Sequence, residues 1–141
     1  MTEPHTSVDE KSVAVVREFL DAMVAEDVER AAALLDPDIA WHNTSLPTVR
    51  GLPRVRRILE GLRRPSLGFD VTIHHIAATG NVVLTERTDV LRLGPVSTRF
   101  WVCGTFELRD GKIAVWDDHY NVGTIVGALG AGALRAVLRR S

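Results

Sequence analysis

The chain has 141 residues, of which 45% are hydrophobic and 25% charged, a size and composition that suit one domain with its own core or pocket. Its formal charge of -1 at pH 7 argues against nucleic acid or an anionic lipid surface as the main partner. The single cysteine, Cys103, excludes a disulfide within the chain, and without a Cys/His cluster no zinc site is expected.

The first residues favour a helix and not a targeting segment. Residues 1–11 contain acids and a proline but no apolar run, so no signal peptide is predicted, and no later apolar segment is long enough to cross a membrane. Ser7 and Glu10 match a capping box, and apolar residues at helical spacing extend this first helix to about Glu26. We therefore expect a cytoplasmic protein with one domain over residues 1–141.

The next elements are shorter. Asp27 is suited to cap a second helix, "VERAAALL", which the sequence "DPD" ends. Residues 39–43, "IAWHN", are predicted to form a short strand. A third helix is predicted to begin at Pro53, a residue favoured in the first helical turn, and to run to about Arg63.

After the third helix the apolar pattern changes to strict alternation, which indicates β-strands. Four strands are predicted, over residues 69–80, 81–94, 96–111 and 112–121. The turn signals between them are Gly80-Asn81, Gly94-Pro95 and Asp110-Gly111, and their close spacing implies antiparallel hairpins. A helix from about Gly123 to Leu138 closes the chain.

This order of elements predicts an α+β fold. We expect a strongly curved, mixed and largely antiparallel sheet, with three N-terminal helices packed in its concave face and a C-terminal helix. Such an arrangement encloses a cone-shaped pocket.

Charged residues occupy strand positions that should face this pocket. Because strand side chains alternate, one face of the strand 81–94 carries Val83, Thr85, Arg87, Asp89, Leu91 and Leu93. The last strand places Trp116, Asp118 and Tyr120 on one face, with Asp117 and His119 on the other. Residues 39–43 likewise direct Ile39, Trp41 and Asn43 to one side.

Two readings of these charges are open. A buried Arg-Asp pair is often structural, and a partly exposed sheet face also tolerates charge. Two carboxylates with one arginine are harder to explain in that way, because burying unpaired charge costs several kcal/mol. A core selected for stability alone would contain apolar residues at these positions.

Three segments, "ERTDVL", "WDDHYN" and "WHNTSLP", resemble the limonene-1,2-epoxide hydrolase family, within the wider nuclear transport factor 2-like or ketosteroid-isomerase-like cone fold. The resemblance covers nearly the whole chain. It implies that Asp118 is a general base, that Asp89 is a general acid and that Arg87 holds both. It also implies that Asn43 helps to orient a water molecule.

Epoxide opening by itself requires such a set. A nucleophile must reach carbon while the departing oxygen gains a proton, so one carboxyl must be ionised and the other protonated. Two close carboxyls in a dry pocket resist double ionisation and tend to share one proton. Since ring strain already activates the substrate, no metal or organic cofactor is expected.

One position departs from the family pattern. Better-known members carry a tyrosine two residues before the asparagine, where this chain has Trp41. An indole N–H donates a hydrogen bond but cannot accept one. Trp41 could therefore still donate to the oxygen of the attacking water.

The sequence thus predicts a cofactor-independent hydrolase that adds water to a lipophilic epoxide of terpene, sterol or fatty-acyl type, giving a vicinal diol. Trp116, Tyr120 and Leu91 are predicted to line the substrate pocket. Two alternatives remain open: an isomerase or cyclase of the same fold, like ketosteroid isomerases or polyketide cyclases, and a non-catalytic dimer that binds a hydrophobic ligand.

A homodimer is also predicted, formed by the outer faces of two sheets. The residues proposed for this face are Val82, Leu84 and Val90, with Val96, Phe100 and Val102 or their alternates on the next strand. The physical reason is that the convex side of a curved sheet still has apolar residues to cover.

Overall fold

The computed structural model describes residues 3–63 and 67–123, together with Gly127, Gly130 and Leu138. The elements in chain order are α1 (Glu3–Val24), α2 (Val28–Ala33), β1 (Leu35–Asn43), β2 (Val49–Arg50), α3 (Leu52–Gly61), β3 (Leu67–Thr79), β4 (Val82–Leu93), β5 (Val96–Arg109) and β6 (Lys112–His119). The predicted C-terminal helix falls largely outside the described residues.

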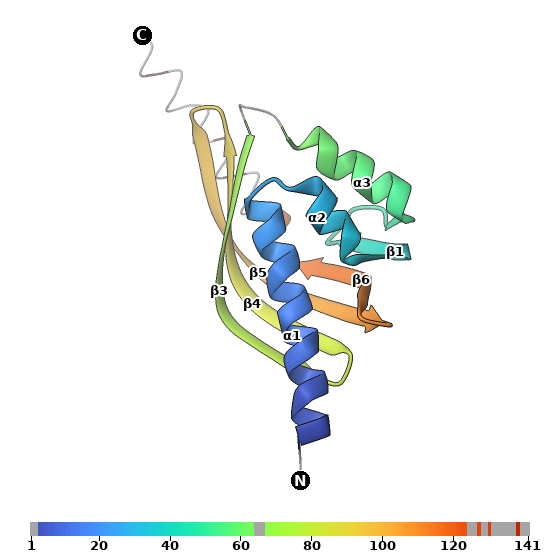
Figure 1. Ribbon diagram of the computed structural model, residues 1–141. Coiled ribbons are helices and arrows are strands. Elements are labelled where there is room, and N and C mark those ends of the chain that lie inside the picture. Colours follow the sequence, from blue (N-terminus) through green and yellow to red (C-terminus); the bar gives the residue numbers. More distant parts are fainter. Residues whose placement is uncertain (1–2, 64–66, 124–126, 128–129, 131–137, 139–141) are drawn as a thin grey trace.

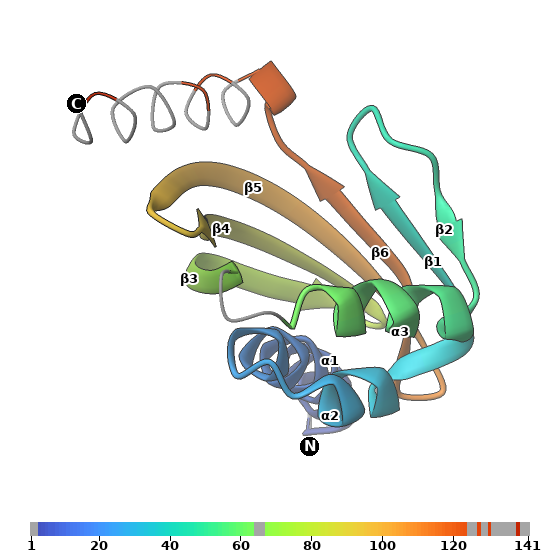
Figure 2. The same cartoon turned by 90° about the horizontal axis from the view of Figure 1, so that it is seen from above.

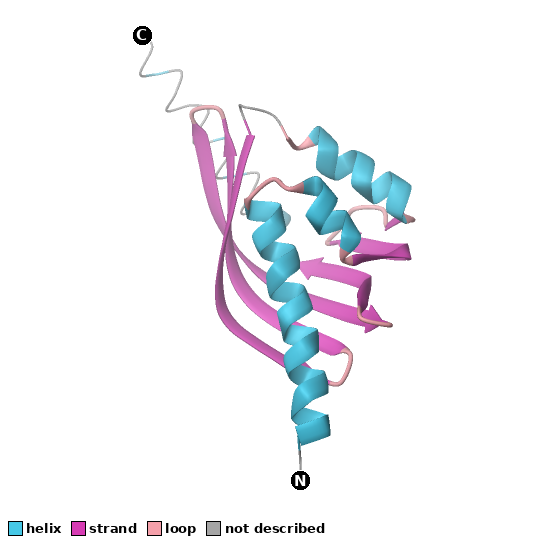
Figure 3. Ribbon diagram, viewed as in Figure 1, coloured by secondary structure: helices cyan, strands magenta, loops and turns pink. Residues whose placement is uncertain are grey.

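The strands form one mixed sheet in the order β2-β1-β6-β5-β4-β3. Strand β1 runs parallel to β6, and the other neighbouring strands are antiparallel. The sheet is strongly curved (Figure 1), and α1, α2 and α3 all lie on its concave side (Figure 2). Colouring by secondary structure separates the helical layer from the sheet (Figure 3). The predicted α+β architecture is therefore confirmed.

Local chemistry explains most of the helix boundaries. Asp27 caps α2 as predicted, because its side chain accepts a hydrogen bond of 3.1 Å from the backbone N–H of Arg30. The capping box at Ser7 was a wrong prediction: α1 begins at Glu3, so Ser7 lies inside the helix. Pro4 does not prevent this earlier start, since a first-turn residue needs no N–H donor.

Strand β1 is longer than predicted. It begins at Leu35 and includes the "DPD" segment that was expected to lie before the strand. The pairing of β1 with β6 shifts between Leu35 and Ala40, and such an irregularity tolerates Pro37, which has no N–H to donate. The two-residue strand β2, which pairs with Ala40 and Trp41, was not predicted.

The three hairpin turns lie where the turn signals placed them. At Asp110-Gly111, both residues have positive φ angles, 52° and 77°, as a two-residue type I′ hairpin turn requires. Within the described ranges, no helix is both long and apolar enough to cross a membrane.

The core lies between the helices and the inner face of the sheet. Its buried members include Val16, Phe19, Leu35, Ile39, Val55, Val83, Phe106 and Ile113. On the outer face Val82, Leu84 and Trp101 have exposed fractions of 39%, 52% and 54%. Phe100 and Val102, two residues predicted for the outer face, instead line the interior, and their alternate Trp101 is the outward residue.

Candidate active site

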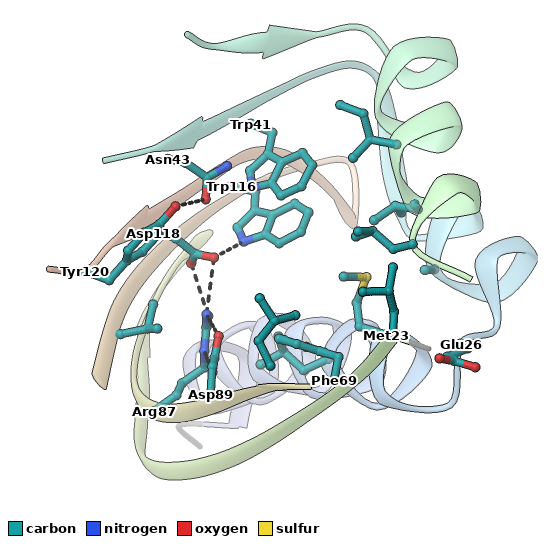
Figure 4. A pocket seen from close by; sticks show the side chains of 18 of the residues that line it. Met23, Glu26, Trp41, Asn43, Phe69, Arg87, Asp89, Trp116, Asp118 and Tyr120 are labelled. Atoms are coloured by element: carbon teal, nitrogen blue, oxygen red, sulfur yellow. Dashed lines mark hydrogen bonds and ion pairs between the residues drawn. The ribbon is translucent and has the colours of Figure 1, made fainter. Parts of the chain in front are cut away.

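A cavity of about 570 Å³ opens between the helices and the inner face of the sheet. Its walls are mainly apolar and include Leu20, Met23, Leu59, Phe69, Leu91, Phe100 and Val102. Asn43, Arg87, Asp89, Asp118 and Tyr120 gather at one end, across the cavity from Met23 and Glu26 (Figure 4). An apolar cavity with a few convergent polar groups is the usual form of a small-molecule site.

The charged residues of the site are deeply buried. Arg87, Asp89 and Asp118 have exposed fractions of 1%, 4% and 6%. The alternation of side chains places them on the inner face as predicted, while Glu86 and Thr88 are directed outward in β4 and Asp117 in β6. The three charges therefore share one interior space, although they come from two strands.

Arg87 bridges the two carboxylates. Its Nε and Nη2 donate to the two oxygens of Asp89 at 3.1 and 2.9 Å. Its Nη1 and Nη2 donate to the two oxygens of Asp118 at 3.2 Å each. Such paired contacts between a planar guanidinium and carboxylates set orientation as well as charge (Figure 4). The predicted convergence of Arg87, Asp89 and Asp118 is thus present.

Burial shifts the titration of this cluster. Desolvation raises the pKa of Asp118 above its ordinary value of 3.8, although the charge and hydrogen bonds of Arg87 oppose this rise. For Arg87 itself, desolvation lowers the pKa, but the charges and hydrogen bonds of Asp118 and Asp89 outweigh it, so the net pKa is raised. The arginine therefore keeps its charge, while Asp118 holds a proton more readily than an exposed aspartate.

Gly104 is a site residue that the sequence prediction missed. It lies on β5, between the strands that carry Arg87 and Asp118, and pairs with Thr85 on one side and Asp118 on the other. A Cβ atom here would lie 2.8 Å from both Arg87 Nη1 and Asp118 Oδ1. A glycine inside a strand often marks such a close approach, and this was the available signal.

Two tryptophans support Asp118 from one side. Trp116 Nε1 donates to Asp118 Oδ2 at 3.0 Å, which adds a third N–H donor to this carboxylate. Trp41 pairs with Trp116 in the β1–β6 register, and their rings stack 4.2 Å apart at an angle of 8°. Among the described residues, Trp41 Nε1 is buried and has no hydrogen-bond partner. Trp41 therefore brings an available donor to the cavity wall.

Asn43 reaches the site through the same register. It lies opposite Asp118 in the parallel pairing of β1 with β6. Its Oδ1 accepts a hydrogen bond of 3.1 Å from the hydroxyl of Tyr120. Thr44 ties the two strand ends together, since its backbone N–H donates to Asp118 O and its Oγ1 accepts from the Tyr120 N–H.

The other predicted pocket residues also lie on the cavity wall, and these are Leu91, Trp116 and Tyr120. His42 and His119 have partners away from this site: His42 Nδ1 contacts Thr48, and His119 Nε2 contacts Asp117 at 3.2 Å. Within the described part of the chain, no group of three or more His, Cys, Asp and Glu residues could hold a metal ion.

Comparison with known proteins links this geometry to a family. A family model described as the limonene-1,2-epoxide hydrolase catalytic domain matches residues 10–130. The epoxide hydrolase EphG of Mycobacterium tuberculosis is 40% identical over 121 residues, which cover 86% of this chain and 80% of that protein. A solved LEH-like epoxide hydrolase from the same organism has a TM-score of 0.84 at 37% identity, covering 93% of this chain and 98% of the other.

More distant structures share the fold alone. A putative ketosteroid isomerase from Kribbella flavida has a TM-score of 0.68 at 21% identity, and 80% of this chain matches 79% of that one. A putative polyketide cyclase from Pseudomonas putida has a TM-score of 0.72 at 19% identity, with coverages of 84% and 97%. The cone fold is thus confirmed, and it is common to proteins with different chemistry.

Proposed function

This chain belongs to the limonene-1,2-epoxide hydrolase family, and we propose that it adds water to a lipophilic epoxide in one step to give a vicinal diol. The observation that carries the proposal is the buried bridge of Arg87 between Asp89 and Asp118 at the end of an apolar cavity. A charge cluster of this kind is costly in a core, and acid/base chemistry gives it a purpose.

Asp118 is the proposed general base. Asn43, its partner in the β1–β6 register, and Tyr120 also line the cavity at this end, so this end suits a water molecule. Because desolvation raises its pKa, ionised Asp118 is a stronger base than an exposed aspartate, and it remains held by Arg87. Asp118 takes a proton from the water while the water oxygen attacks an epoxide carbon.

Asp89 is the proposed general acid. As the ring C–O bond breaks, Asp89 transfers its proton to the departing oxygen, which becomes the second hydroxyl of the diol. One proton thus leaves the pair and one returns to it, so the pair carries the same total charge before and after the reaction. Arg87 contacts both carboxylates throughout and stabilises whichever one is ionised.

The attacking water is proposed to lie between Asp118, Asn43 and Trp41. A water oxygen at this place would satisfy the buried indole N–H of Trp41, which has no partner among the described residues. Bound water is the common explanation for such a donor. No metal or organic cofactor takes part in the proposed step.

The substrate is proposed to be a terpene, sterol or fatty-acyl epoxide. The cavity volume of about 570 Å³ lies within the range of drug-sized ligand sites, and its walls offer large apolar side chains. Trp116, Tyr120 and Leu91 are proposed to contact the substrate close to the reacting carbon atoms.

A homodimer and a cytoplasmic location remain proposals, as does one domain over residues 1–141. The exposed outer-face residues Val82, Leu84 and Trp101 suit a contact between two sheets. Light scattering at micromolar concentration should report twice the mass of one chain, and a mass of 15.5 kDa would contradict the dimer.

The decisive experiment measures diol formation from a panel of epoxides by the wild-type protein, Asp118→Asn and Asp117→Asn. Asp118→Asn keeps the shape but cannot take a proton, so diol formation should fall at least roughly 10²–10⁴-fold. Asp117 is the matched control, one residue away on the outer face. A wild-type protein that forms no diol, or a loss of activity in Asp117→Asn alone, would overturn the proposal.

A further inference from the structure

The hydroxyl of Tyr120 is hydrogen-bonded to Asn43 on the wall of the cavity. Tyr120 Oη donates to Asn43 Oδ1 at 3.1 Å, and both residues line the cavity next to Asp118 (Figure 4). A carboxamide has an acceptor end and a donor end of nearly equal shape, so only its hydrogen bonds decide which end faces a ligand. Because the oxygen accepts from Tyr120, the NH₂ group is the end left for the cavity.

We propose that Tyr120 is a positioning residue, whose hydroxyl orients the Asn43 amide so that its N–H donates to the attacking water. This inference rests on the proposed epoxide hydrolysis and adds a residue to it. The water oxygen has two lone pairs and accepts from Asn43 and Trp41, so the Trp41 N–H must release one of them as the oxygen bonds to the epoxide carbon, while Asn43 keeps the water in place. An Asn43 in the opposite orientation would instead accept the second O–H of the water and would offer the water oxygen no donor.

The surroundings hold the hydroxyl as a donor. Burial and the charge of Asp118 raise the pKa of Tyr120 above its ordinary value of 10.0, so the phenol stays protonated. The Tyr120 backbone N–H donates to Thr44 Oγ1, and its ring packs against Phe100 at a centroid distance of 5.7 Å. The backbone and the ring of Tyr120 are therefore each held by a contact, and the hydroxyl bonds to Asn43.

Among the described residues, Tyr120 is the group that holds the Asn43 amide. Within the described residues, the side chain of Asn43 has a hydrogen bond with Tyr120 and with no other side chain or backbone group. The buried side-chain atoms without a partner do not include the NH₂ of Asn43. This group is therefore accessible, and it faces the cavity that Asn43 lines. Loss of the Tyr120 hydroxyl should therefore free the amide to flip.

A double-mutant cycle tests this role. Tyr120→Phe removes only the oxygen, and kcat should fall about 2- to 10-fold while KM stays within about twofold, the range of one hydrogen bond. In the Asn43→Ala background the same change should have no further effect, because the group that it orients is gone. An equal loss in both backgrounds, or a rise in KM alone, would mean that the Tyr120 hydroxyl acts on the substrate and not through Asn43, and would overturn the proposal.

A second test of the hydrogen bond does not depend on catalytic activity. Tyr120 is the only tyrosine of the chain, so growth on 3-fluorotyrosine labels this position alone. The single ¹⁹F resonance should shift in Asn43→Ala and stay in place in Asp117→Asn, and an unchanged resonance in Asn43→Ala would contradict the hydrogen bond. If wild-type protein forms no diol, the proposed function fails. If wild-type protein forms the diol and Tyr120→Phe has the same kcat, only this inference fails.

Discussion

Arg87 and Asp118 belong to strands that are not neighbours, yet two hydrogen bonds of 3.2 Å join their side chains. Strand β5 runs between them and places Gly104 directly beneath the contact. The long arginine side chain crosses this strand where no Cβ stands in its way. The pairing of base and counter-charge therefore depends on a residue that has no functional group.

Replacing Gly104 with alanine should damage the site more than the fold. The new methyl group would meet Arg87 Nη1 and Asp118 Oδ1 at 2.8 Å, so at least one of them must move. A misplacement on the order of 1 Å can cost 10²-fold in rate, and overpacking costs about 1–3 kcal/mol of stability. Steady-state kinetics and chemical denaturation would measure both effects.

The matched control is Gly61→Ala, at the end of α3, where an added Cβ meets nothing within 4 Å. That variant should keep wild-type activity. If Gly104→Ala had full activity, the close approach would be irrelevant to catalysis.

Arg87→Ala should be the most destabilising change at the site. It leaves Asp89 and Asp118 buried without a counter-charge, and removing one partner of a buried ion pair costs about 3–5 kcal/mol. The loss in the free energy of unfolding should become smaller as pH falls, because Asp118, whose pKa is raised by burial, then takes up a proton and loses its charge. Arg92→Ala, an exposed position in the same strand, should change little. Equal stabilities of both variants would show that the cluster is not held by Arg87.

Asp89→Asn should abolish most activity by a route different from that of Asp118→Asn. No acid remains to protonate the departing oxygen, so kcat should fall roughly 10²–10⁴-fold. An epoxide with an electron-withdrawing group beside that oxygen forms a less basic alkoxide and should lose less rate in Asp89→Asn than in Asp118→Asn. If the two variants respond alike to this substrate series, the acid and base assignments are not supported.

The dependence of kcat/KM on pH should reflect the titration of Asp118. Because its pKa is raised above 3.8 in the fold, the general base becomes active only as pH rises above that value, and kcat/KM should rise with it. The stability effect has the opposite direction: a raised carboxyl pKa favours folding of the protonated form, so its contribution is largest below 3.8 and declines as pH rises through the folded pKa. Asp118→Asn should remove this titration from denaturation curves measured across the same range.

Much of the site could be predicted because strand alternation is a local property. The alternation in β4 and β6 placed Arg87, Asp89 and Asp118 on the inner face, and the structure agrees. On β5 the sequence did not distinguish the two faces, since Phe100, Trp101 and Val102 are all large and apolar. The structure buries Val102 and exposes Trp101, and so shows which face of β5 is the inner one.

The helix and strand ends were less predictable. A capping box at Ser7 is a valid local signal, but the helix begins earlier because Pro4 is equally acceptable in a first turn. The "DPD" segment is a poor strand by propensity, yet it lies within β1, between Leu35 and Ala40, which both pair with β6. In both cases the local signal alone did not determine the boundary.

The sequence by itself determined which side chains share a face, because the two-residue period of a strand is set within one strand. Only the tertiary structure decided which faces meet, because strand order and register depend on contacts between residues far apart in the chain. The parallel pairing of β1 with β6 brings Asn43 beside Asp118, and Trp41 onto Trp116. The same pairing places the Tyr120 hydroxyl on Asn43, a contact across 77 positions of sequence that no local pattern encodes.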